Sequence, residues 1–162
     1  MDIRLADDAD WPGIWSIFRV VVSSGDTYAY DPNTPEDEAR RLWTAAPARA
    51  YVAIDLESGA VVGTYTLRPN QPGLGSHVAN AGFMVAPGLS GRGTGRALGE
   101  HALAEARRLG FEAMQFNFVV STNERAVRLW QALGFAIVGT VPGAFRHRGL
   151  GPVDVHVMHR RL

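Results

Sequence analysis

The stretch LSGRGTGR at residues 89–96 lies between an apolar run and a segment with helical periodicity. Its alternating glycines leave the backbone open to a ligand, and a strand-to-helix junction gathers unpaired N–H donors at the positive end of a helix dipole. A phosphate or pyrophosphate is the anion that such a junction binds. We expect it to contact the backbone of Arg92, Gly93, Thr94, Gly95 and Arg96, with charge-assisted contacts from the two guanidinium groups. A flexible loop with a glycine hinge is the alternative that the glycines alone leave open.

Two well-known phosphate-binding loops do not match this stretch. A P-loop needs a lysine and then Ser or Thr after its last glycine, and this region contains no lysine. A dinucleotide-binding fold places its glycine loop after the first strand, whereas this loop follows the fourth predicted strand. Nucleoside triphosphate hydrolysis and dinucleotide binding are therefore disfavoured.

The composition limits the classes of protein and partner. With 162 residues and 46% hydrophobic content, the chain suits one domain, residues 1–162. Its 16 basic and 16 acidic residues balance, so we expect neither nucleic acid nor a membrane as partner. The absence of cysteine excludes disulfides, thiolate metal sites and a cysteine nucleophile, and we expect no metal. The acidic start MDIRLADDADWPG argues against a secretory signal or membrane anchor, so we expect the cytoplasm.

Hydrophobic periodicity and turn residues predict an α/β (α+β) chain in the order strand, two helices, three strands, helix, strand, helix, two strands. The predicted strands are 2–6, a hairpin over 49–69 with its turn at 57–60, 76–87, 111–120, 135–141 and 153–162; the predicted helices are 8–25, 34–46, 95–110 and 123–134. We expect Thr34 to cap the second helix, with Pro35 as its first residue and an end near Pro47. Long irregular connections are expected at 23–33 and 142–152, where substrate contacts are common.

Two segments resemble the hallmark motifs of one family. MVAPGLSGRGTGRALGEHAL and STNERAVRLWQALGFAIVGTVPG are similar to those of the GCN5-related N-acetyltransferases (GNAT), and the predicted element order matches that fold from end to end. The resemblance implies a mixed, mostly antiparallel central sheet and a glycine loop whose amides hold the pyrophosphate of acetyl-coenzyme A (acetyl-CoA). The family pattern is Gln or Arg, two residues, Gly, one residue, Gly or Ala. Its glycines fall on Gly93 and Gly95, and its first position falls on Ser90, a departure that removes one side-chain contact.

The resemblance also implies where the acetyl group is transferred. In the family the fourth and fifth strands splay apart, a β-bulge in the fourth leaves amides free, and the pantetheine arm lies in the gap. That arrangement places the arm beside Phe83, Met84 and Val85, with the amide of Val85 or Phe83 as the donor to the thioester oxygen. For these side chains, ordinary burial in a strand is the alternative account.

Two further positions are expected to contact the coenzyme. Ser121, Thr122 and Asn123 can each cap the helix that follows, and the resemblance gives Asn123 a further hydrogen bond to the coenzyme. Trp130 stands where the family often has a tyrosine that protonates the leaving thiolate. An indole N–H can hydrogen bond sulfur but is not an acid near neutral pH, so either another group protonates the thiolate or it leaves unprotonated.

No general base is obvious. Many family members carry a Glu in the fourth strand, whereas HVANAGF offers only Asn80 close to the centre, with His77 further out; Asn80 can orient water or bind substrate but cannot accept a proton. The remaining titratable candidates are His77, Asp26, Asp154 and His156, and our hypothesis is that a water chain ending on one of them deprotonates the amine. Structural or solvent-facing roles are the alternative for each.

The acceptor is suggested by two loops with opposite character. Asp26, Tyr28, Tyr30 and Asp31 precede the second predicted helix, where the family builds its acceptor wall, and suit a cationic amine. In GAFRHRG, Arg146 and its neighbours are suited to a carboxylate or a phosphate. A small zwitterion would use both loops, and solvated loop charges explain them equally well.

These observations favour an acetyl-CoA-dependent N-acetyltransferase that acts on a small amine, such as an amino acid, by direct attack in a ternary complex. A covalent acetyl-enzyme is disfavoured because there is no cysteine and no serine beside a convincing His and acid. The alternative from another class is a non-catalytic acyl-CoA-binding or sensing module of the same fold. The resemblance also implies a homodimer through the last strands.

Overall fold

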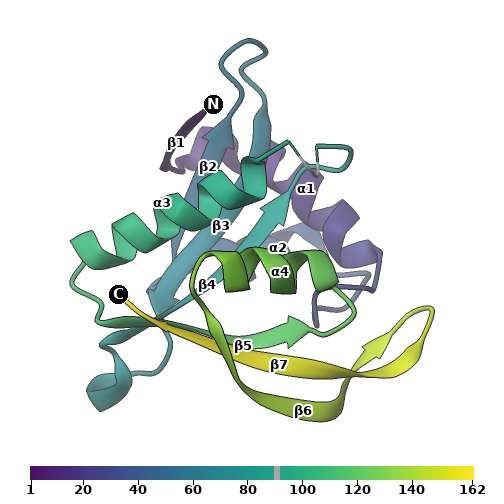
Figure 1. Ribbon diagram of the computed structural model, residues 1–162. Coiled ribbons are helices and arrows are strands. Elements are labelled where there is room, and N and C mark those ends of the chain that lie inside the picture. Colours follow the sequence, from purple (N-terminus) through teal and green to yellow (C-terminus); the bar gives the residue numbers. More distant parts are fainter. Residues whose placement is uncertain (90–91) are drawn as a thin grey trace.

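The computed structural model describes residues 1–89 and 92–162, and its elements follow the predicted order (Figure 1). The helices are α1 (Trp11–Ser23), α2 (Glu36–Thr44), α3 (Thr94–Arg108) and α4 (Glu124–Ala132), with short 3-10 turns η1 (Asp8–Asp10) and η2 (Gly73–Gly75). The strands are β1 (Asp2–Leu5), β2 (Arg49–Ile54), β3 (Val61–Pro69), β4 (Val78–Val85), β5 (Ala113–Val120), β6 (Ala136–His147) and β7 (Gly151–Arg161). The predicted α/β (α+β) class and the predicted order are confirmed.

The strands form one sheet of seven in the order β1-β2-β3-β4-β5-β7-β6. Neighbours are antiparallel except β4 and β5, which are parallel. Parallel neighbours need a long crossover, and α3 supplies it between β4 and β5. The sheet is therefore mixed and mostly antiparallel, as the resemblance implied.

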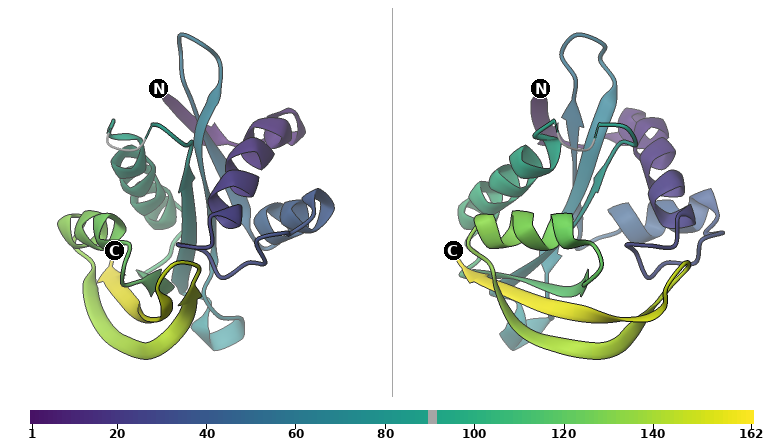
Figure 2. Two further views of the ribbon diagram at one scale, coloured as in Figure 1. Left: turned by 90° about the vertical axis from the view of Figure 1, so that its right-hand side faces the viewer. Right: turned by 45° about the vertical axis from the view of Figure 1, so that its right-hand side comes forward.

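Two helices cover each face of the sheet, and each pair has its own hydrophobic core (Figure 2). On one face, Leu98, Ala102 and Trp130 of α3 and α4 pack on Tyr65 and the neighbouring strands. On the other face, the buried aromatic side chains of α1 and α2 pack on β2 and on Met84 of β4. Alternate residues of β4 therefore face different helix pairs, so this strand can contribute to sites on both sides.

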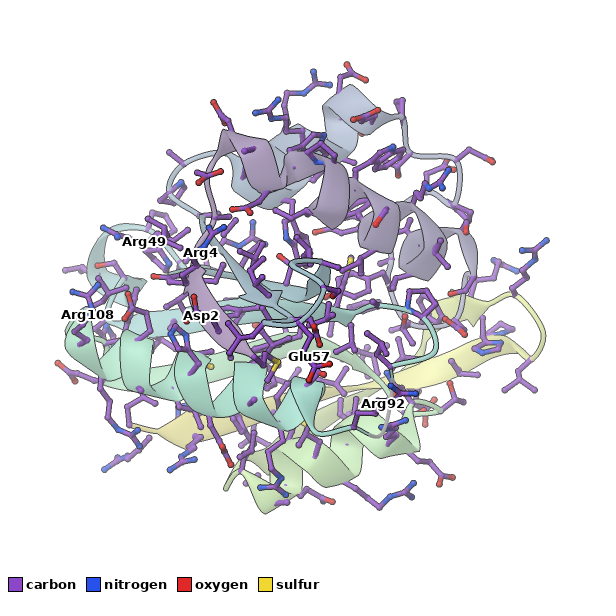
Figure 3. The ribbon with its side chains drawn as sticks, turned by 90° about the horizontal axis from the view of Figure 1, so that it is seen from above. Asp2, Arg4, Arg49, Glu57, Arg92 and Arg108 are labelled. Carbon is purple, nitrogen blue, oxygen red and sulfur yellow. The ribbon has the colours of Figure 1, made fainter. Side chains whose placement is uncertain are left out.

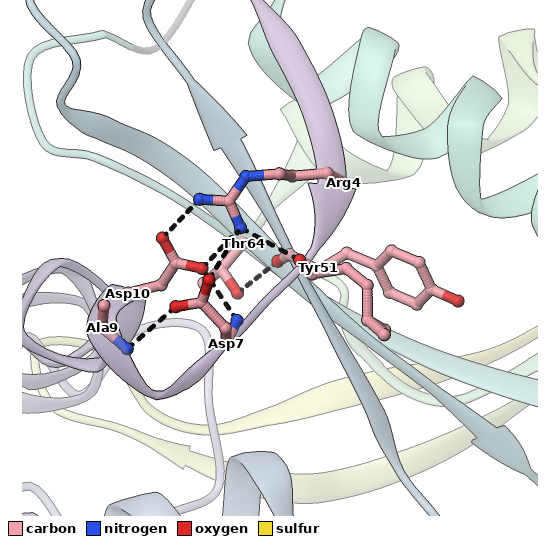
Figure 4. Close-up of polar contacts among 7 residues, drawn as sticks. Arg4, Asp7, Ala9, Asp10, Tyr51 and Thr64 are labelled. Carbon is pink, nitrogen blue, oxygen red and sulfur yellow. Dashed lines mark hydrogen bonds and ion pairs between the residues drawn. The ribbon is translucent and has the colours of Figure 1, made fainter.

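A partly buried ion pair fixes the start of α1 against β1. The guanidinium of Arg4 contacts both carboxylate oxygens of Asp10, at 2.7 and 2.8 Å (Figure 4). This hydrogen-bonded pair lowers the pKa of Asp10 despite the burial of its carboxylate. Asp10 also accepts from the backbone N–H of Asp7, while the side chain of Asp7 accepts from Ala9 and caps the short turn. The turn η1, which leads directly into α1, is thus held by reciprocal capping.

Two predictions of local structure were wrong. Thr34 does not cap α2: the helix begins at Glu36, and the Thr34 hydroxyl donates to the carbonyl of Asp31. The segment 142–152 is not irregular, because β6 continues to His147 and β7 begins at Gly151. A register shift between Val141 and Phe145 accommodates the proline and glycine there, and an edge strand such as β6 tolerates both.

Candidate active site

A cleft of about 490 Å³ opens where β4 and β5 separate. The two strands pair only at Val78 with Ala113 and at Ala79 with Met114, and diverge beyond that point (Figure 1). The cleft is lined from both faces of the sheet: by Val21, Thr27–Tyr30 and Trp43, by Thr66, Arg68 and residues 80–85, by residues 116–120, and by Asn123, Ala126 and Trp130. A ligand in the cleft can therefore meet another that enters from the opposite face.

The separation leaves one edge of β4 without a partner strand. The N–H of Asn70 donates to the carbonyl of Val78, and the N–H of Ala86 donates to the carbonyl of Val62, so even-numbered residues of β4 point their backbone groups at β3. By alternation, the backbone groups of Phe83 and Val85 point into the gap. These are the amides that we expect to polarise a bound carbonyl.

The β-bulge that we expected in β4 is not what frees these amides. The register of β4 with β3 runs without a shift from Ala79 opposite Pro69 to Val85 opposite Gly63. The irregularity lies instead in β5, whose register with β7 shifts between Phe116 and Val119. A bulge bends the strand that carries it, and this one lies in the part of β5 that no longer pairs with β4.

The α3–α4 side of the cleft is aromatic. Trp130 packs against Phe83 with ring centroids 4.7 Å apart and against Phe116 at 4.8 Å, and its side chain is buried. Asn123 caps α4, since its side chain accepts from the N–H of Ala126 at 3.2 Å. Of the three residues expected to cap this helix, Asn123 is the one that does so. This half of the cleft presents an apolar wall suited to a flexible, largely apolar arm.

The N-terminus of α3 presents free backbone donors. Gly93 is the residue before the helix and has φ 90°, a left-handed conformation that favours glycine, and within residues 1–89 and 92–162 no side chain caps this end. The first-turn amides of Thr94, Gly95 and Arg96 are therefore available to an anion. Figure 3 shows Arg92 at this end of α3 and Arg108 at the other. Ser90 lies outside the described residues.

The opposite half of the cleft is built from cross-strand pairs of β3 and β4. Thr66 lies opposite Gly82, and Arg68 lies opposite Asn80. Because alternate residues of a strand share a face, these four residues form one wall with Arg68 and Asn80 at its outer end. Of the residues lining the cleft, Arg68 alone carries a charge, so the described lining is cationic on this side.

Tyr28 and Tyr30 form the facing wall. Their rings stack with centroids 5.6 Å apart, and the hydroxyl of Tyr28 donates to the carbonyl of Phe83 at 2.9 Å. Burial raises the pKa of Tyr28 far above its usual value, and it raises that of Tyr30 as well, although the nearby charge of Arg68 opposes the shift at Tyr30. Both side chains are therefore neutral phenols at physiological pH.

The chain that forms this gap between parallel strands, beside the N-terminus of α3, matches a known family. A model of the acetyltransferase (GNAT) family matches residues 13–135. The chain belongs to this family. It is an acetyltransferase by this membership, and the expectation drawn from its two motifs is confirmed.

Named relatives agree with the GNAT assignment. N-acetyltransferase aca1 of Schizosaccharomyces pombe is 32% identical over 152 residues, covering 84% of this chain and 72% of that protein. A GCN5-related N-acetyltransferase from Kribbella flavida superposes with a TM-score of 0.94 at 52% identity, covering 99% of this chain and 97% of that one. A phosphinothricin acetyltransferase from Sinorhizobium meliloti, in complex with acetyl-CoA, gives a TM-score of 0.88 at 25% identity, covering 99% of this chain and 88% of the other.

Most of the predicted site residues lie in two places in this GNAT fold, on the cleft lining and at the start of α3. Those on the cleft lining are Tyr28, Tyr30, Asn80, Phe83, Met84, Val85, Asn123 and Trp130. Within β4, Met84 is buried against the α1–α2 core, so its side chain is structural. Arg92, Gly93, Thr94, Gly95 and Arg96 lie at the start of α3. For Gly95, a Cβ would lie 3.5 Å from Leu129, which shows that this glycine packs beside α4 in ordinary contact.

Four other predicted residues, and one further candidate base, lie off the cleft lining. His77 precedes β4 and is exposed, and the Asp26 carboxylate accepts from the Ser24 hydroxyl. Asp154 is exposed on β7, where its side chain accepts from the N–H of Gly143 at 3.0 Å. Arg146 is exposed on β6. His156 lies on β7 with Nδ1 2.9 Å from the hydroxyl of Thr140. None of the five is among the described residues that line the cleft.

Sequence reasoning missed Arg68. The sequence indicates only the end of a hairpin strand at this residue, whereas its pairing with Asn80 sets it on the cleft wall. Locating it requires the register between β3 and β4, and the connection between them, residues 70–77, contains no tight turn that fixes a register. The one available signal was alternation, because Thr64, Thr66 and Arg68 share a face.

Proposed function

We propose that this GNAT protein transfers an acetyl group from acetyl-CoA to the amine of a small molecule by direct attack in a ternary complex. The observation that carries the proposal is the cleft, which joins the two faces of the sheet at a strand edge whose amides are free. One substrate approaches from the α3–α4 face and the other from the α1–α2 face, so their reacting atoms meet between β4 and β5.

The residues that hold the acetyl donor follow from this placement. Acetyl-CoA supplies an activated acetyl group as a thioester. The amides at the start of α3 bind its pyrophosphate, Asn123 and Trp130 border its arm, and the Phe83 or Val85 N–H donates to the oxygen that gains negative charge. A relative bound to acetyl-CoA supports this arrangement.

The acceptor that fits the described lining best is an amino acid. Arg68 offers an uncompensated cation at the mouth of the cleft, with the amides of Asn80 and Asn117 nearby, and a carboxylate is the group that a guanidinium binds bidentately. Asp26, the group expected to attract a cationic amine, is not on the lining. The name of one relative, a phosphinothricin acetyltransferase, is consistent with an amino-acid acceptor.

Turnover measured as thiol release from acetyl-CoA tests the proposal. We expect saturable, amine-dependent release with at least one α-amino acid, such as phosphinothricin or L-methionine. Tight coenzyme A binding without turnover on any amine of a broad panel would overturn it in favour of a non-catalytic sensing module. Trp130 in place of a tyrosine, and a described lining without carboxylate or imidazole, are the observations that favour that second candidate.

The proposal also covers domain organisation, location and oligomeric state. We propose one domain, a cytoplasmic location and a homodimer formed through β6 and β7. In the described residues no helix is both long and apolar enough to cross a membrane. The edge strand β6 exposes Val138 and Val141, whose side chains are 61% and 49% exposed, and an apolar edge of this kind suits burial against a second copy. Light scattering of the purified chain tests the dimer, and a monomer at all concentrations would refute it.

A further inference from the structure

The hydroxyl of Tyr28 lies at the floor of the acceptor half of the cleft, against the free edge of β4. It donates to the carbonyl of Phe83 at 2.9 Å, and the backbone groups of Phe83 face the gap. A Cβ at Gly82 would lie 3.1 Å from this oxygen, closer than most Cβ contacts in proteins. Glycine at this position therefore lets a phenol from the α1–α2 loop approach the strand edge where transfer is proposed.

The Tyr28 ring is held in place by its neighbours. Tyr30 stacks on it with ring planes 20° apart, and Trp43 packs edge-on with centroids 6.2 Å apart. Trp43 is itself fixed, because its indole N–H donates to the Thr64 hydroxyl at 3.0 Å. The hydroxyl thus occupies one position, and an atom that is preorganised loses little entropy when it binds a substrate.

A phenol has one proton to donate and lone pairs that accept. Burial raises the pKa of Tyr28, so the proton stays on its oxygen, and that proton is committed to Phe83. What Tyr28 presents to the cleft is therefore an acceptor. In the described residues the lining contains no carboxylate or imidazole to compete for this role.

We infer that the Tyr28 oxygen accepts an N–H from the acceptor amine and aims the nitrogen lone pair at the thioester carbon. The inference rests on the proposed function. A neutral primary amine has two N–H donors and one lone pair, so fixing one N–H restricts the direction of the lone pair. The carbonyl to be attacked lies by the same argument beside the N–H of Phe83 or Val85, on the same edge of β4.

The chemical step balances without an acid or base from Tyr28. The amine reaches the cleft as an ammonium ion and loses a proton to water before attack. The N–C bond then forms and the C–S bond breaks, with its electron pair leaving on sulfur, while the nitrogen loses a second proton to the thiolate or to water. As the nitrogen becomes positive, its N–H···O bond to Tyr28 becomes charge-assisted, so the contact is stronger in the transition state than before it.

Tyr30 provides a matched control. It has the same side chain and stacks on the same ring, but its hydroxyl senses the charge of Arg68 at the cleft mouth and makes no hydrogen bond to β4 among the described contacts. Tyr28→Phe and Tyr30→Phe each remove one oxygen and keep the aromatic packing. The comparison therefore separates the role of the Tyr28 hydroxyl from the role of the ring stack.

The experiment measures kcat and KM for both variants with acetyl-CoA and L-methionine or phosphinothricin, together with calorimetric binding of coenzyme A and thermal unfolding. For Tyr28→Phe we expect kcat to fall ~10- to 100-fold, the size of a lost hydrogen bond to a charged group. We expect its coenzyme A affinity and its pH profile to remain those of the wild type. For Tyr30→Phe we expect a smaller loss of kcat than for Tyr28→Phe, because the Tyr30 hydroxyl makes no hydrogen bond to β4 among the described contacts.

The outcomes distinguish this inference from the proposed function. Wild-type protein that binds coenzyme A but acetylates no amine refutes the proposed function, and this inference with it. If the wild type acetylates an amine and Tyr28→Phe does so at the same rate, only the role of Tyr28 is refuted. An equal loss of kcat in both variants, or a loss of kcat that follows a loss of coenzyme A affinity, assigns the effect to packing and also overturns the inference.

Discussion

Nδ2 of Asn80 donates a 2.9 Å hydrogen bond to the backbone carbonyl of Gln115, one step beyond the last paired residues of β4 and β5. The side chain supplies a donor where the backbone of β4 no longer does, because the backbone groups of Asn80 point towards β3. Asn80 therefore ties the two strands at the point where the cleft opens. This role differs from the catalytic one that the sequence suggested for it.

The first prediction concerns this bond. Asn80→Ala should lower the free energy of unfolding by about 1 kcal/mol, because the carbonyl of Gln115 loses its donor in a partly buried place. It should also weaken binding of the acceptor, since β4 and β5 are no longer joined by this bond at the point where they separate. Urea denaturation measures the first effect and KM the second. Asn117→Ala is the control for stability alone, because the Nδ2 of Asn117 bonds Asn70 on the exposed surface; an equal loss of stability in both variants would contradict the prediction.

The second prediction concerns the α3 N-terminus. Gly93→Ala forces a Cβ into a left-handed conformation, which costs about 1–2 kcal/mol, and it reshapes the turn that presents the helix amides. The variant must recover this free energy when it restores the turn to bind coenzyme A. We therefore expect the coenzyme A affinity measured by calorimetry to fall ~10-fold.

Gly88→Ala is the matched control for this experiment. Gly88 lies in the same connection and has φ 79°, and a Cβ added there, as at Gly93, would meet no described atom within 4 Å, but Gly88 precedes the turn at α3. The Gly88→Ala variant should lose a similar amount of stability and keep its coenzyme A affinity. Unchanged affinity in Gly93→Ala would mean that the pyrophosphate binds elsewhere.

Features with a local cause could be predicted from sequence. The turn at Gly93 and the cap at Asn123 each depend on a few consecutive residues, and the structure has a left-handed glycine and a side-chain cap there. The prediction for Thr34 was also local, but a turn that begins at Asp31 and the expected cap of α2 both require the Thr34 hydroxyl. Asp31 accepts from the N–H of Asn33 through its side chain and from Thr34 through its carbonyl, so its own turn takes the hydroxyl that a cap would need.

Features that depend on register or on curvature could not be predicted. The pairing of Arg68 with Asn80 and the bulge in β5 depend on strand registers that no two-residue hairpin turn sets. The distance of Asp154 from the cleft has the same cause, since its place on β7 depends on how β5, β7 and β6 are ordered. Most of the acceptor wall is of this second kind.

The third prediction tests Arg68 as the group that binds the acceptor carboxylate. Arg68→Gln should raise KM for an α-amino acid by about 10-fold, because a partly solvated ion pair is lost. It should leave KM for the corresponding decarboxylated amine unchanged. Initial rates with L-methionine and its decarboxylated amine measure both.

Arg146→Gln is the control for Arg68, since Arg146 is exposed on β6 away from the cleft lining. We expect wild-type KM values for both amines. If KM for the α-amino acid rises more in Arg146→Gln than in Arg68→Gln, the carboxylate is bound by Arg146 in the segment GAFRHRG, as the sequence suggested. Equal losses on the two amines in Arg68→Gln would instead show that Arg68 shapes the cleft without binding a carboxylate.

The last prediction concerns stability against pH and a polar cluster beneath α3. The hydroxyl of Tyr65, which is fully buried, lies 2.8 Å from Nδ1 of His101. Burial lowers the pKa of His101 below its ordinary 6.5, and the charges of Glu105 and Asp2 only partly oppose the shift. As pH falls below 6.5, the unfolded chain binds a proton that the folded chain does not, so the free energy of unfolding falls by at most about 1.4 kcal/mol per pH unit.

Urea denaturation between about pH 5 and pH 8 measures this slope, and His101→Gln should remove it. His77→Gln is the control, because His77 is exposed and should change nothing. Glu105 acts in a lower range: the Arg108 guanidinium holds the pKa of this carboxyl at about 2, so its contribution is complete above 4.5 and is lost only as pH falls towards 2. A slope below pH 6.5 that survives in His101→Gln would therefore have to come from another group, and the assignment to His101 would be wrong.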